Sequence, residues 1–163
     1  MAVPRPTALR STSIRALADL LGAPAADLPD VCVTGVTLDS RSVLPGDLYA
    51  ALPGARAHGA DFVAAAAASG ALAVLTDAVG ARRVRDSSVD LPLLVVQEPR
   101  AVLGSVAARV LGTDHLTLRM LGITGTNGKT TTAYLVHSAL TALGEGTGLI
   151  GTVETRIGDE RLG

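Results

Sequence analysis

Apolar and polar residues follow one another along the chain in a pattern that predicts alternating helices and strands. Ser13 can cap a helix whose apolar residues recur at helical spacing as far as Gly22. Alternation of strands and helices favours a sheet of parallel strands with helical crossovers, an α/β fold. The strands are expected at residues 31–38, 47–52, 71–76 and 91–97, and the later helices at 61–69, 78–84 and 99–111.

The pattern begins again after a short polar break at residues 112–115. A strand is expected at 116–123, a helix at 130–143 and a further strand at 148–153. A strand–helix–strand unit alone cannot bury both faces of its sheet. We therefore expect two domains. Residues 1–112 form a whole small α/β domain, and residues 113–163 form the truncated opening of a second α/β domain.

A glycine-rich segment between the last expected strand and helix is typical of a phosphate-binding loop, and it reads Gly122-Ile-Thr-Gly-Thr-Asn-Gly-Lys-Thr-Thr-Thr132. Gly125 and Gly128 let the backbone approach a phosphate without a Cβ in the way. The N–H groups at the start of the following helix would add a partial positive charge. Lys129 supplies a full charge for the outer phosphates, and the Thr130 hydroxyl could ligate Mg²⁺.

The spacing of this loop departs from the common phosphate-loop pattern, because Gly122 lies one position too early. The alternative interpretation is therefore a glycine-rich turn between a strand and a helix, with an exposed lysine.

Composition narrows the possible protein classes. Apolar residues make up 48 % of the 163 residues and aromatic residues only 2 %, so alanine, valine and leucine must build the core. The net charge of −1, without a basic block, gives nucleic-acid binding little electrostatic support. Cys32, the single cysteine, excludes a disulfide within the chain and is expected to pack as a small apolar residue.

No apolar run reaches the roughly 18–20 residues of a membrane span, and the N-terminus lacks signal-peptide character. We expect a cytoplasmic protein that binds no membrane.

Motifs in both halves of the chain resemble those of the Mur ligase family of peptidoglycan synthesis. The first half carries Val36-Thr-Leu-Asp-Ser-Arg41, Pro45-Gly-Asp-Leu-Tyr-Ala-Ala-Leu-Pro-Gly54 and His58-Gly-Ala-Asp-Phe62. The second half carries the glycine-rich loop and then Gly148-Leu-Ile-Gly-Thr152. The unusual spacing of the loop is itself a feature of these ligases. The resemblance implies a uridine-nucleotide domain followed by the start of an ATP-binding domain.

The resemblance also implies an activity. Mur ligases use ATP and Mg²⁺ to form an amide bond through an acyl phosphate. Gly148-Leu-Ile-Gly-Thr152 favours the members that add a diamino acid to UDP-N-acetylmuramoyl-L-Ala-D-Glu over those that add D-Ala-D-Ala. Which diamino acid is added stays open. The alternatives are a phosphate-loop ATPase or a uridine-nucleotide binding module outside cell-wall synthesis. We expect a monomer that binds no nucleic acid, and we expect the 163-residue chain to be inactive by itself.

Site residues follow from the resemblance. ATP would be held by Gly125, Thr126, Asn127, Gly128, Lys129, Thr130 and Thr131. Lys129 would be catalytic, and either Thr130 or Thr131 would ligate Mg²⁺. Leu38 and Ser40 would contact the uracil–ribose end of the other substrate. Ala55, Arg56 and Ala57 would lie against its uridine or diphosphate.

Three further residues keep two interpretations each. His58 could contact the diphosphate or merely start a helix. Asp39 and Arg41 could serve the site or form a local turn with a salt bridge.

Overall fold

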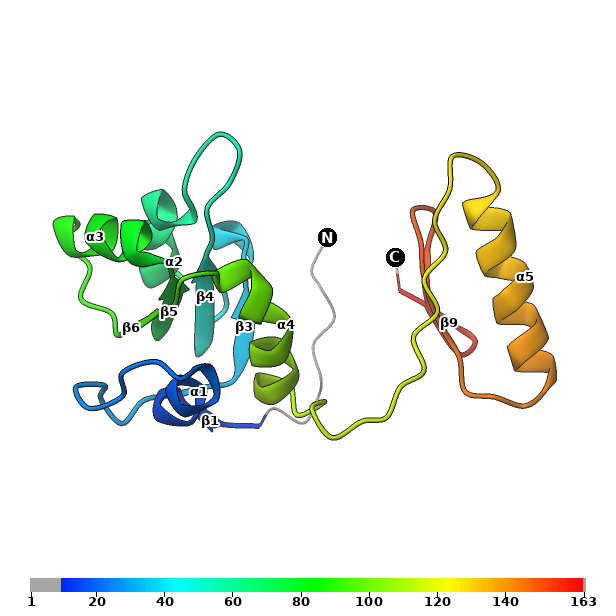
Figure 1. The fold of residues 1–163 in the computed structure, drawn as a ribbon, viewed down its shortest axis with the longest axis horizontal. Helices are drawn as coiled ribbons and strands as arrows, with labels where there is room; N and C mark the ends of the chain where they lie inside the picture. Colours follow the sequence, from blue (N-terminus) through cyan, green and yellow to red (C-terminus); the bar gives the residue numbers. More distant parts are fainter. Residues whose placement is uncertain (1–9, 163) are drawn as a thin grey trace. The chain divides into compact units, whose positions relative to one another are not determined.

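The first unit is built on a parallel sheet of four strands (Figure 1). The structure, a computed structural model, describes residues 10–162 and divides them into two units, residues 10–116 and residues 117–162. Strands that follow one another in the chain are neighbours in the sheet, in the order β3-β4-β5-β6. Their bounds are Gly35–Thr37 for β3, Asp47–Ala51 for β4, Ala73–Thr76 for β5 and Leu93–Val95 for β6.

Helical segments cover both faces of this sheet. Helices α1 and α4 pack on one face, where they bury Leu48 and Leu75. Helices α2 and α3, with the 3₁₀ turn η2, pack on the other face around Tyr49 and Val74. Neighbouring residues of a strand point to opposite faces, and both faces of this sheet are covered. All five residues of β4 are therefore buried. The bounds are Ile14–Leu21 for α1, Ser40–Ser42 for η1, Gly59–Phe62 for η2, Val63–Ala68 for α2, Ala78–Asp86 for α3 and Pro99–Val110 for α4.

The expected α/β fold is confirmed, and so are the signals at the ends of α1. The Ser13 hydroxyl accepts a hydrogen bond from the Ala16 N–H at 3.2 Å. Gly22 ends the helix in the left-handed conformation, with φ of 61°. A polar cap and a glycine stop thus determine both ends of the helix, as the sequence predicted.

The single strand predicted at 31–38 was wrong, because the structure breaks it at Thr34. Strand β2 (Cys32–Val33) pairs antiparallel with β1 (Thr12–Ser13), while β3 pairs parallel with β4. Between them the Thr34 N–H donates to the Gly46 carbonyl at 2.9 Å, which turns the chain from one sheet to the other. Cys32 is exposed, so its expected packing in the core was also wrong.

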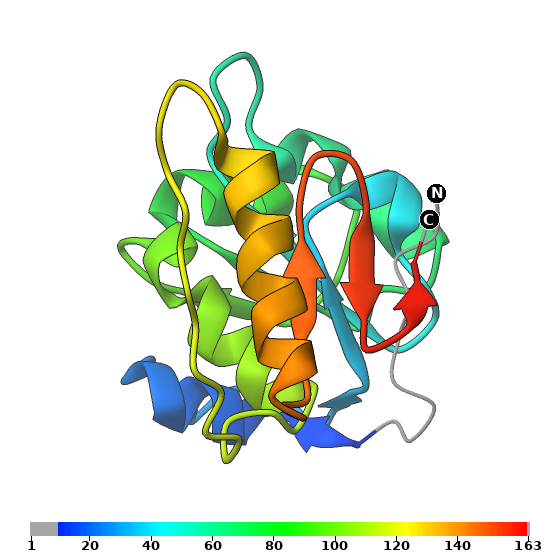
Figure 2. The same ribbon diagram turned by 90° about the vertical axis from the view of Figure 1, so that its right-hand side faces the viewer.

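The second unit consists of helix α5 (Lys129–Ala142) and a small antiparallel sheet. Strand β7 (Gly148–Ile150) pairs with β8 (Thr155–Ile157), which pairs with β9 (Glu160–Arg161). Figure 2 shows α5 lying alongside β7. The helix predicted at 130–143 is confirmed. The strand predicted at 148–153 ends early, since the Gly151 N–H donates to the Glu154 carbonyl at 3.1 Å and turns the chain back.

The strand predicted at 116–123 does not form. Within the described residues no strand pairs with this segment, and an extended chain without a hydrogen-bonded neighbour is not a stable strand. Its apolar side chains are accordingly exposed, at 71 % for Leu118 and 80 % for Met120. The prediction of a parallel strand–helix–strand unit in this part of the chain was therefore wrong.

Among the helices of residues 10–162, none has both the length and the apolar character that crossing a bilayer requires.

Candidate functional site

The glycine-rich loop of the second unit leads directly into α5. Gly125 has φ of 144° and Gly128 has φ of 75°, a region that side chains with a Cβ rarely adopt. The first helical hydrogen bond runs from the Thr132 N–H to the Gly128 carbonyl at 2.9 Å. In the described part of the chain no side chain caps this helix. The N–H groups of the first turn, which precede Thr132, are therefore left to face an anion at the loop.

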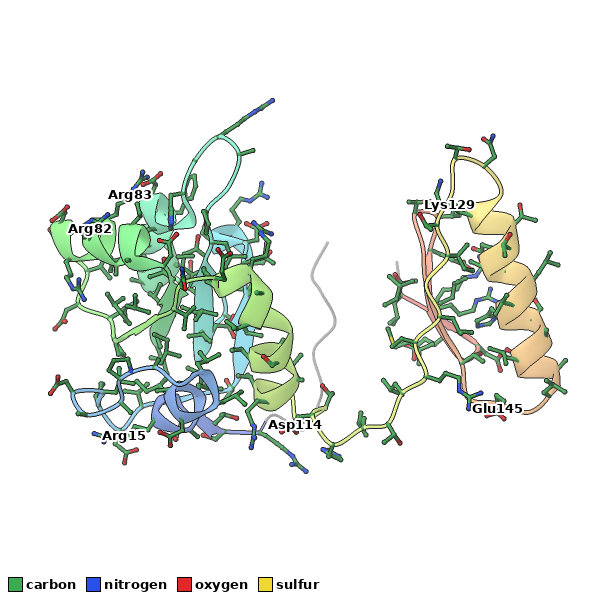
Figure 3. The ribbon with its side chains drawn as sticks, viewed as in Figure 1. Arg15, Arg82, Arg83, Asp114, Lys129 and Glu145 are labelled. Carbon is green, nitrogen blue, oxygen red and sulfur yellow. The ribbon has the colours of Figure 1, made fainter. Side chains whose placement is uncertain are left out.

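Lys129 brings a positive charge to the same loop (Figure 3). It is the only lysine of the sequence. Its ammonium group donates a hydrogen bond to the Gly125 carbonyl, so the side chain folds back over the loop rather than extending away from it. The side chain is exposed, as are those of Thr126, Asn127, Thr130 and Thr131. The structure thus gathers accessible N–H groups, hydroxyls and one cation at a single loop, an arrangement suited to phosphate groups.

The sequence-predicted substrate residues of the first unit lie at one edge of its sheet. Leu38 follows β3 and is 60 % exposed, and Ser40 begins η1. The exposed residues 55–57 follow β4, in a tight loop that projects beyond the end of that strand (Figure 1). Because β3 and β4 are parallel neighbours, both segments lie at the carboxyl edge, where open α/β sheets bind their ligands.

The loop after β4 is closed by its own backbone. The Gly54 N–H donates to the Ala57 carbonyl at 3.1 Å, and Pro53 pairs with His58 at its base. The Arg100 guanidinium of α4 donates to the Pro53 carbonyl at 3.1 Å. These contacts hold the exposed side chains of residues 55–57 on a short, closed turn.

His58 is held inside the protein rather than presented at the surface. It is 7 % exposed, and its Nδ1 accepts a hydrogen bond from the Ala60 N–H at 3.0 Å, which starts η2. Its Nε2 lies 3.2 Å from Asp77 Oδ1. The accepting Nδ1 assigns the hydrogen to Nε2, which then donates to the carboxylate. Both ring nitrogens are occupied, which favours the interpretation of His58 as a helix-start residue.

Sequence reasoning missed four residues that fix this edge of the sheet. The Thr76 hydroxyl donates to the Ala51 carbonyl at 2.8 Å, and the Tyr49 hydroxyl donates to the Gly59 carbonyl at 2.9 Å. Asp77 could have been found, because an aspartate directly before a helical segment is an N-cap signal. The other three, Tyr49, Thr76 and Arg100, give no sequence signal, because their partners are backbone carbonyls distant in the chain.

Asp39 and Arg41 form the local salt bridge that the sequence allowed. The Arg41 Nε donates to Asp39 Oδ1 at 2.9 Å, and its terminal nitrogen donates to Oδ2 at 2.8 Å. The hydrogen bond from the Arg41 side chain is the main reason why the pKa of Asp39 falls from 3.8 to about 2. Asp39 also accepts from the Arg41 N–H at 3.0 Å, so the pair shapes the start of η1.

The Asp77 carboxylate should make the stability of the first unit depend on pH. Burial raises the pKa of Asp77, but the Gly80 N–H and the His58 ring outweigh it, and the pKa lies below its ordinary value of 3.8. A lowered pKa means that the carboxylate stabilises the folded state above pH 3.8, and that this stabilisation is lost as the pH falls through the lowered value. We expect Asp77→Asn to be less stable at neutral pH and to lose less stability on acidification.

Urea unfolding at neutral pH and near roughly pH 3 measures this difference. Asp86→Asn, which removes a carboxylate from the other end of α3, is the matched control for the loss of one negative charge. If the stability of Asp77→Asn fell as steeply with falling pH as that of the unchanged protein, the proposed linkage would be contradicted.

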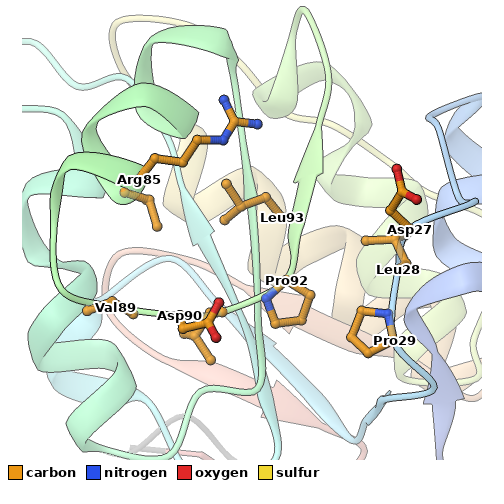
Figure 4. Close-up of a pocket in the computed structure, with 10 residues that line it drawn as sticks. Asp27, Leu28, Pro29, Arg85, Val89, Asp90, Pro92 and Leu93 are labelled. Carbon is orange, nitrogen blue, oxygen red and sulfur yellow. The ribbon is translucent and has the colours of Figure 1, made fainter.

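Two hollows of the first unit lie away from these residues. One, of about 420 Å³, separates Leu28 and Pro29 from Pro92 and Leu93, with Arg85 of α3 above it (Figure 4). The other, of about 570 Å³, adjoins it along α3. Neither is lined by a sequence-predicted substrate residue. We place the candidate site at the carboxyl edge of the sheet, because Leu38, Ser40 and the exposed residues 55–57 follow neighbouring parallel strands there.

Comparisons with known proteins cover both units. Residues 32–110 match the catalytic domain of the Mur ligase family, and residues 123–162 match the Mur ligase middle domain. The UDP-N-acetylmuramoyl-L-alanyl-D-glutamate--2,6-diaminopimelate ligase of Streptomyces coelicolor is 57 % identical over 159 residues, which are 98 % of this chain and 31 % of that protein. The chain thus spans less than a third of the length of this relative.

Solved structures agree on the fold. A UDP-N-acetylmuramoyl-L-alanyl-D-glutamate--2,6-diaminopimelate ligase aligns with a TM-score of 0.69 at 24 % identity, over 93 % of this chain and 30 % of that one. The MurF ligase of Thermotoga maritima in complex with ADP aligns with a TM-score of 0.51 at 28 % identity, over 66 % of this chain and 23 % of that one.

Proposed function

The chain belongs to the Mur ligase family, and on that premise we propose that the whole protein is an ATP-dependent ligase that adds a diamino acid to UDP-N-acetylmuramoyl-L-Ala-D-Glu. Identity of 57 % to the Streptomyces coelicolor ligase, over 98 % of this chain, is the observation that carries the proposal. The name of that relative favours 2,6-diaminopimelate as the amino acid. The product is a building block of peptidoglycan, made in the cytoplasm.

The two units take separate parts of this activity. Residues 1–112 form the uridine-nucleotide domain, and residues 113–163 form the opening of the ATP-binding domain. The backbone N–H groups of the loop hold the ATP phosphates, together with the side chains of Thr126, Asn127 and Thr131. Lys129 acts on the γ-phosphoryl group, where negative charge builds up during transfer. The ADP bound to the related Thermotoga maritima ligase supports a nucleotide site in this family.

Magnesium fits this loop only as a partner of the nucleotide phosphates. The described residues contain no group of three or more His, Cys, Asp or Glu side chains that could hold a metal ion by themselves. The Thr130 hydroxyl, in the first turn of α5, would supply one oxygen ligand, and Mg²⁺ usually takes the rest from phosphates and water. When bound, the ion neutralises charge on the phosphates.

The uridine-nucleotide end occupies the carboxyl edge of the first sheet. Leu38 and Ser40 contact the uracil and ribose, and Ala55, Arg56 and Ala57 lie against the uridine or diphosphate. Arg56 is the charged member of the exposed turn and suits a diphosphate. His58 does not touch the substrate in this account. It ties the turn to Asp77 and so holds Arg56 in place.

The reaction takes place in two displacements. A carboxylate oxygen of D-glutamate attacks the γ-phosphorus, the bond to the β-phosphate oxygen breaks, and ADP leaves. The amine of the diamino acid then attacks the acyl carbon and loses a proton. Inorganic phosphate leaves with the carboxylate oxygen that made the first attack. The carboxylate is a poor electrophile, so phosphorylation supplies the leaving group, and the protein contributes positioning and charge neutralisation.

Labelled substrate tests both the acyl phosphate and the amino acid. UDP-N-acetylmuramoyl-L-Ala-D-Glu carrying a heavy oxygen isotope in the glutamate carboxylate is incubated with the whole protein, ATP, Mg²⁺ and 2,6-diaminopimelate, lysine or D-Ala-D-Ala. We expect one heavy oxygen in each phosphate released, and a product heavier by 2,6-diaminopimelate less water. Unlabelled phosphate would exclude the acyl phosphate. A product formed only with D-Ala-D-Ala would move the protein to the other branch of the family.

A further inference from the structure

The outer edge of β6 pairs with no other strand in the described part of the chain. β6 is the last strand in the order β3-β4-β5-β6, so only its inner edge has a neighbour. The Val96 N–H donates to the Thr76 carbonyl of β5 at 3.0 Å. Alternate residues of a strand bond to the same neighbour in a parallel ladder. The N–H and C=O groups of Leu93 and Val95 therefore point away from β5, where a further strand could pair with them.

The two hollows of the first unit lie along this edge, and together we call them the β6 trough. The hollow of about 420 Å³ lies at the amino end of β6 and is lined by residues 89–92. The hollow of about 570 Å³ lies at the carboxyl end, beside Val95. Both volumes fall in the range of roughly 300–1,000 Å³ that is usual for ligand sites. Figure 4 shows Leu93, which lines both hollows, between Arg85 of α3 and Leu28. An unpaired strand edge thus opens onto a hollow of ligand size.

Charges of opposite sign lie at the two ends of the β6 trough. Asp90 lines its amino end and Arg82 its carboxyl end, while Asp27 and Arg85 line both hollows. All four side chains are exposed, and none of them forms an ion pair with another described residue. Asp27 and Arg85 offset each other in the middle, which leaves a negative amino end and a positive carboxyl end. A ligand with a basic group beside Asp90 and an acidic group beside Arg82 matches this distribution of charge.

We propose that the β6 trough binds an extended segment of a partner protein, which pairs with β6 as a fifth strand and carries a basic residue at one end and an acidic residue at the other. In this mode of recognition the main-chain hydrogen bonds provide affinity, and alternate side chains provide specificity. Leu93 packs on the face of the sheet that α3 covers, and Leu94 packs on the opposite face. The bound segment alternates in the same way.

This proposal does not depend on the proposed ligase function, because none of the residues proposed to bind ATP or the uridine nucleotide lines the β6 trough.

Three peptides with the same middle and different ends test the charge pattern. Acetyl-Lys-Thr-Val-Thr-Val-Thr-Glu-amide has opposite charges at its ends, and the two related peptides have lysine or glutamate at both ends. Their blocked termini leave the side chains as the only charges. Titration calorimetry with the whole protein should show that the mixed peptide binds about threefold more tightly than either related peptide. Equal affinities for the three peptides, or no binding of the mixed peptide, would overturn the proposal.

Val95→Pro tests the pairing with β6. Proline lacks the N–H group, and since the Val95 N–H points away from β5, its loss leaves the existing ladder intact. The affinity for the mixed peptide should fall by about fivefold to tenfold, the effect of one hydrogen bond. Val95→Ala shortens the side chain but keeps the N–H, so this matched control should weaken binding less. Equal losses of affinity in Val95→Pro and Val95→Ala would contradict strand pairing.

Arg82→Glu keeps the proposal testable if Val95→Pro does not fold, because it changes only an exposed side chain. Both ends of the β6 trough are negative in this variant, so the peptide with lysine at both ends should become the tightest binder. Arg83→Glu is the same change at the next residue, which pairs with Asp61 and does not line the trough, and the mixed peptide should stay preferred. An unchanged order of affinities in Arg82→Glu would refute the charge pattern.

Sedimentation of the whole protein tests for a different occupant of the same edge. A dimer that Val95→Pro dissociates would overturn the proposal in favour of a second copy of the chain paired along β6. A sedimentation coefficient that is the same in Val95→Pro and in the unchanged protein is the expected result.

Discussion

Lys129→Ala in the whole protein should lower kcat by about a thousandfold or more. The ammonium group is the one full positive charge on the glycine-rich loop, where it contacts the Gly125 carbonyl. Charge that develops on a transferring phosphoryl group is stabilised mainly by such fixed cations, and removing one costs on the order of 10²–10³ or more in rate. ADP formation in the presence of both other substrates measures the loss.

Arg119→Ala is the matched control for this variant. It removes one positive charge from an exposed side chain of the same unit, six positions before Gly125, and should leave kcat within about twofold. A Lys129→Ala protein that folds and releases ADP at nearly the normal rate would show that the loop is not the site of phosphoryl transfer.

Gly59→Ala should destabilise the first unit. A Cβ at this position would lie 2.8 Å from both the Ala51 Cα and the Leu52 nitrogen, backbone atoms at the end of β4 that cannot rotate away. The Gly59 N–H also donates to the Leu52 carbonyl at 2.8 Å, so the loop would have to move as a whole. We expect a loss of about 1–3 kcal/mol in the free energy of unfolding, together with weaker UDP binding.

Gly104→Ala is the same chemical change, but it should stabilise the first unit. Gly104 lies within α4, and nothing lies within 4 Å of a Cβ placed there. Alanine should raise the free energy of unfolding by about 0.5–1 kcal/mol, because glycine is unfavourable inside a helix. Urea unfolding of both variants provides the comparison, and equal effects at the two positions would contradict the packing described around Gly59.

The features that the sequence predicted well depend on local chemistry. Ser13 and Gly22 determine α1 by capping, and the pattern of apolar residues from Thr130 onward is enough to predict α5. The phosphate loop is visible because its chemistry requires glycines and a lysine next to one another. The parallel sheet follows from the alternation of strands and helices, since helical crossovers join parallel strands.

The features that the sequence did not predict depend on contacts distant in the chain. An apolar run at 116–123 has strand character, but a strand also needs a partner, and the described residues provide none. Tyr49 appears as an ordinary apolar position in β4 until its hydroxyl is placed against Gly59. His58 was ambiguous for the same reason, because Asp77, its partner at 3.2 Å, lies on the far side of β5 in the chain.

Phosphate release by the whole protein shows whether it is a ligase that needs both the nucleotide substrate and the amino acid. The protein is given ATP and Mg²⁺, and then UDP-N-acetylmuramoyl-L-Ala-D-Glu and 2,6-diaminopimelate, separately and together. Sustained release that requires both the nucleotide substrate and the amino acid is the predicted result, and it would establish a ligase that couples the two units. Release that depends on neither the nucleotide substrate nor the amino acid would identify a general ATPase and contradict the proposed function.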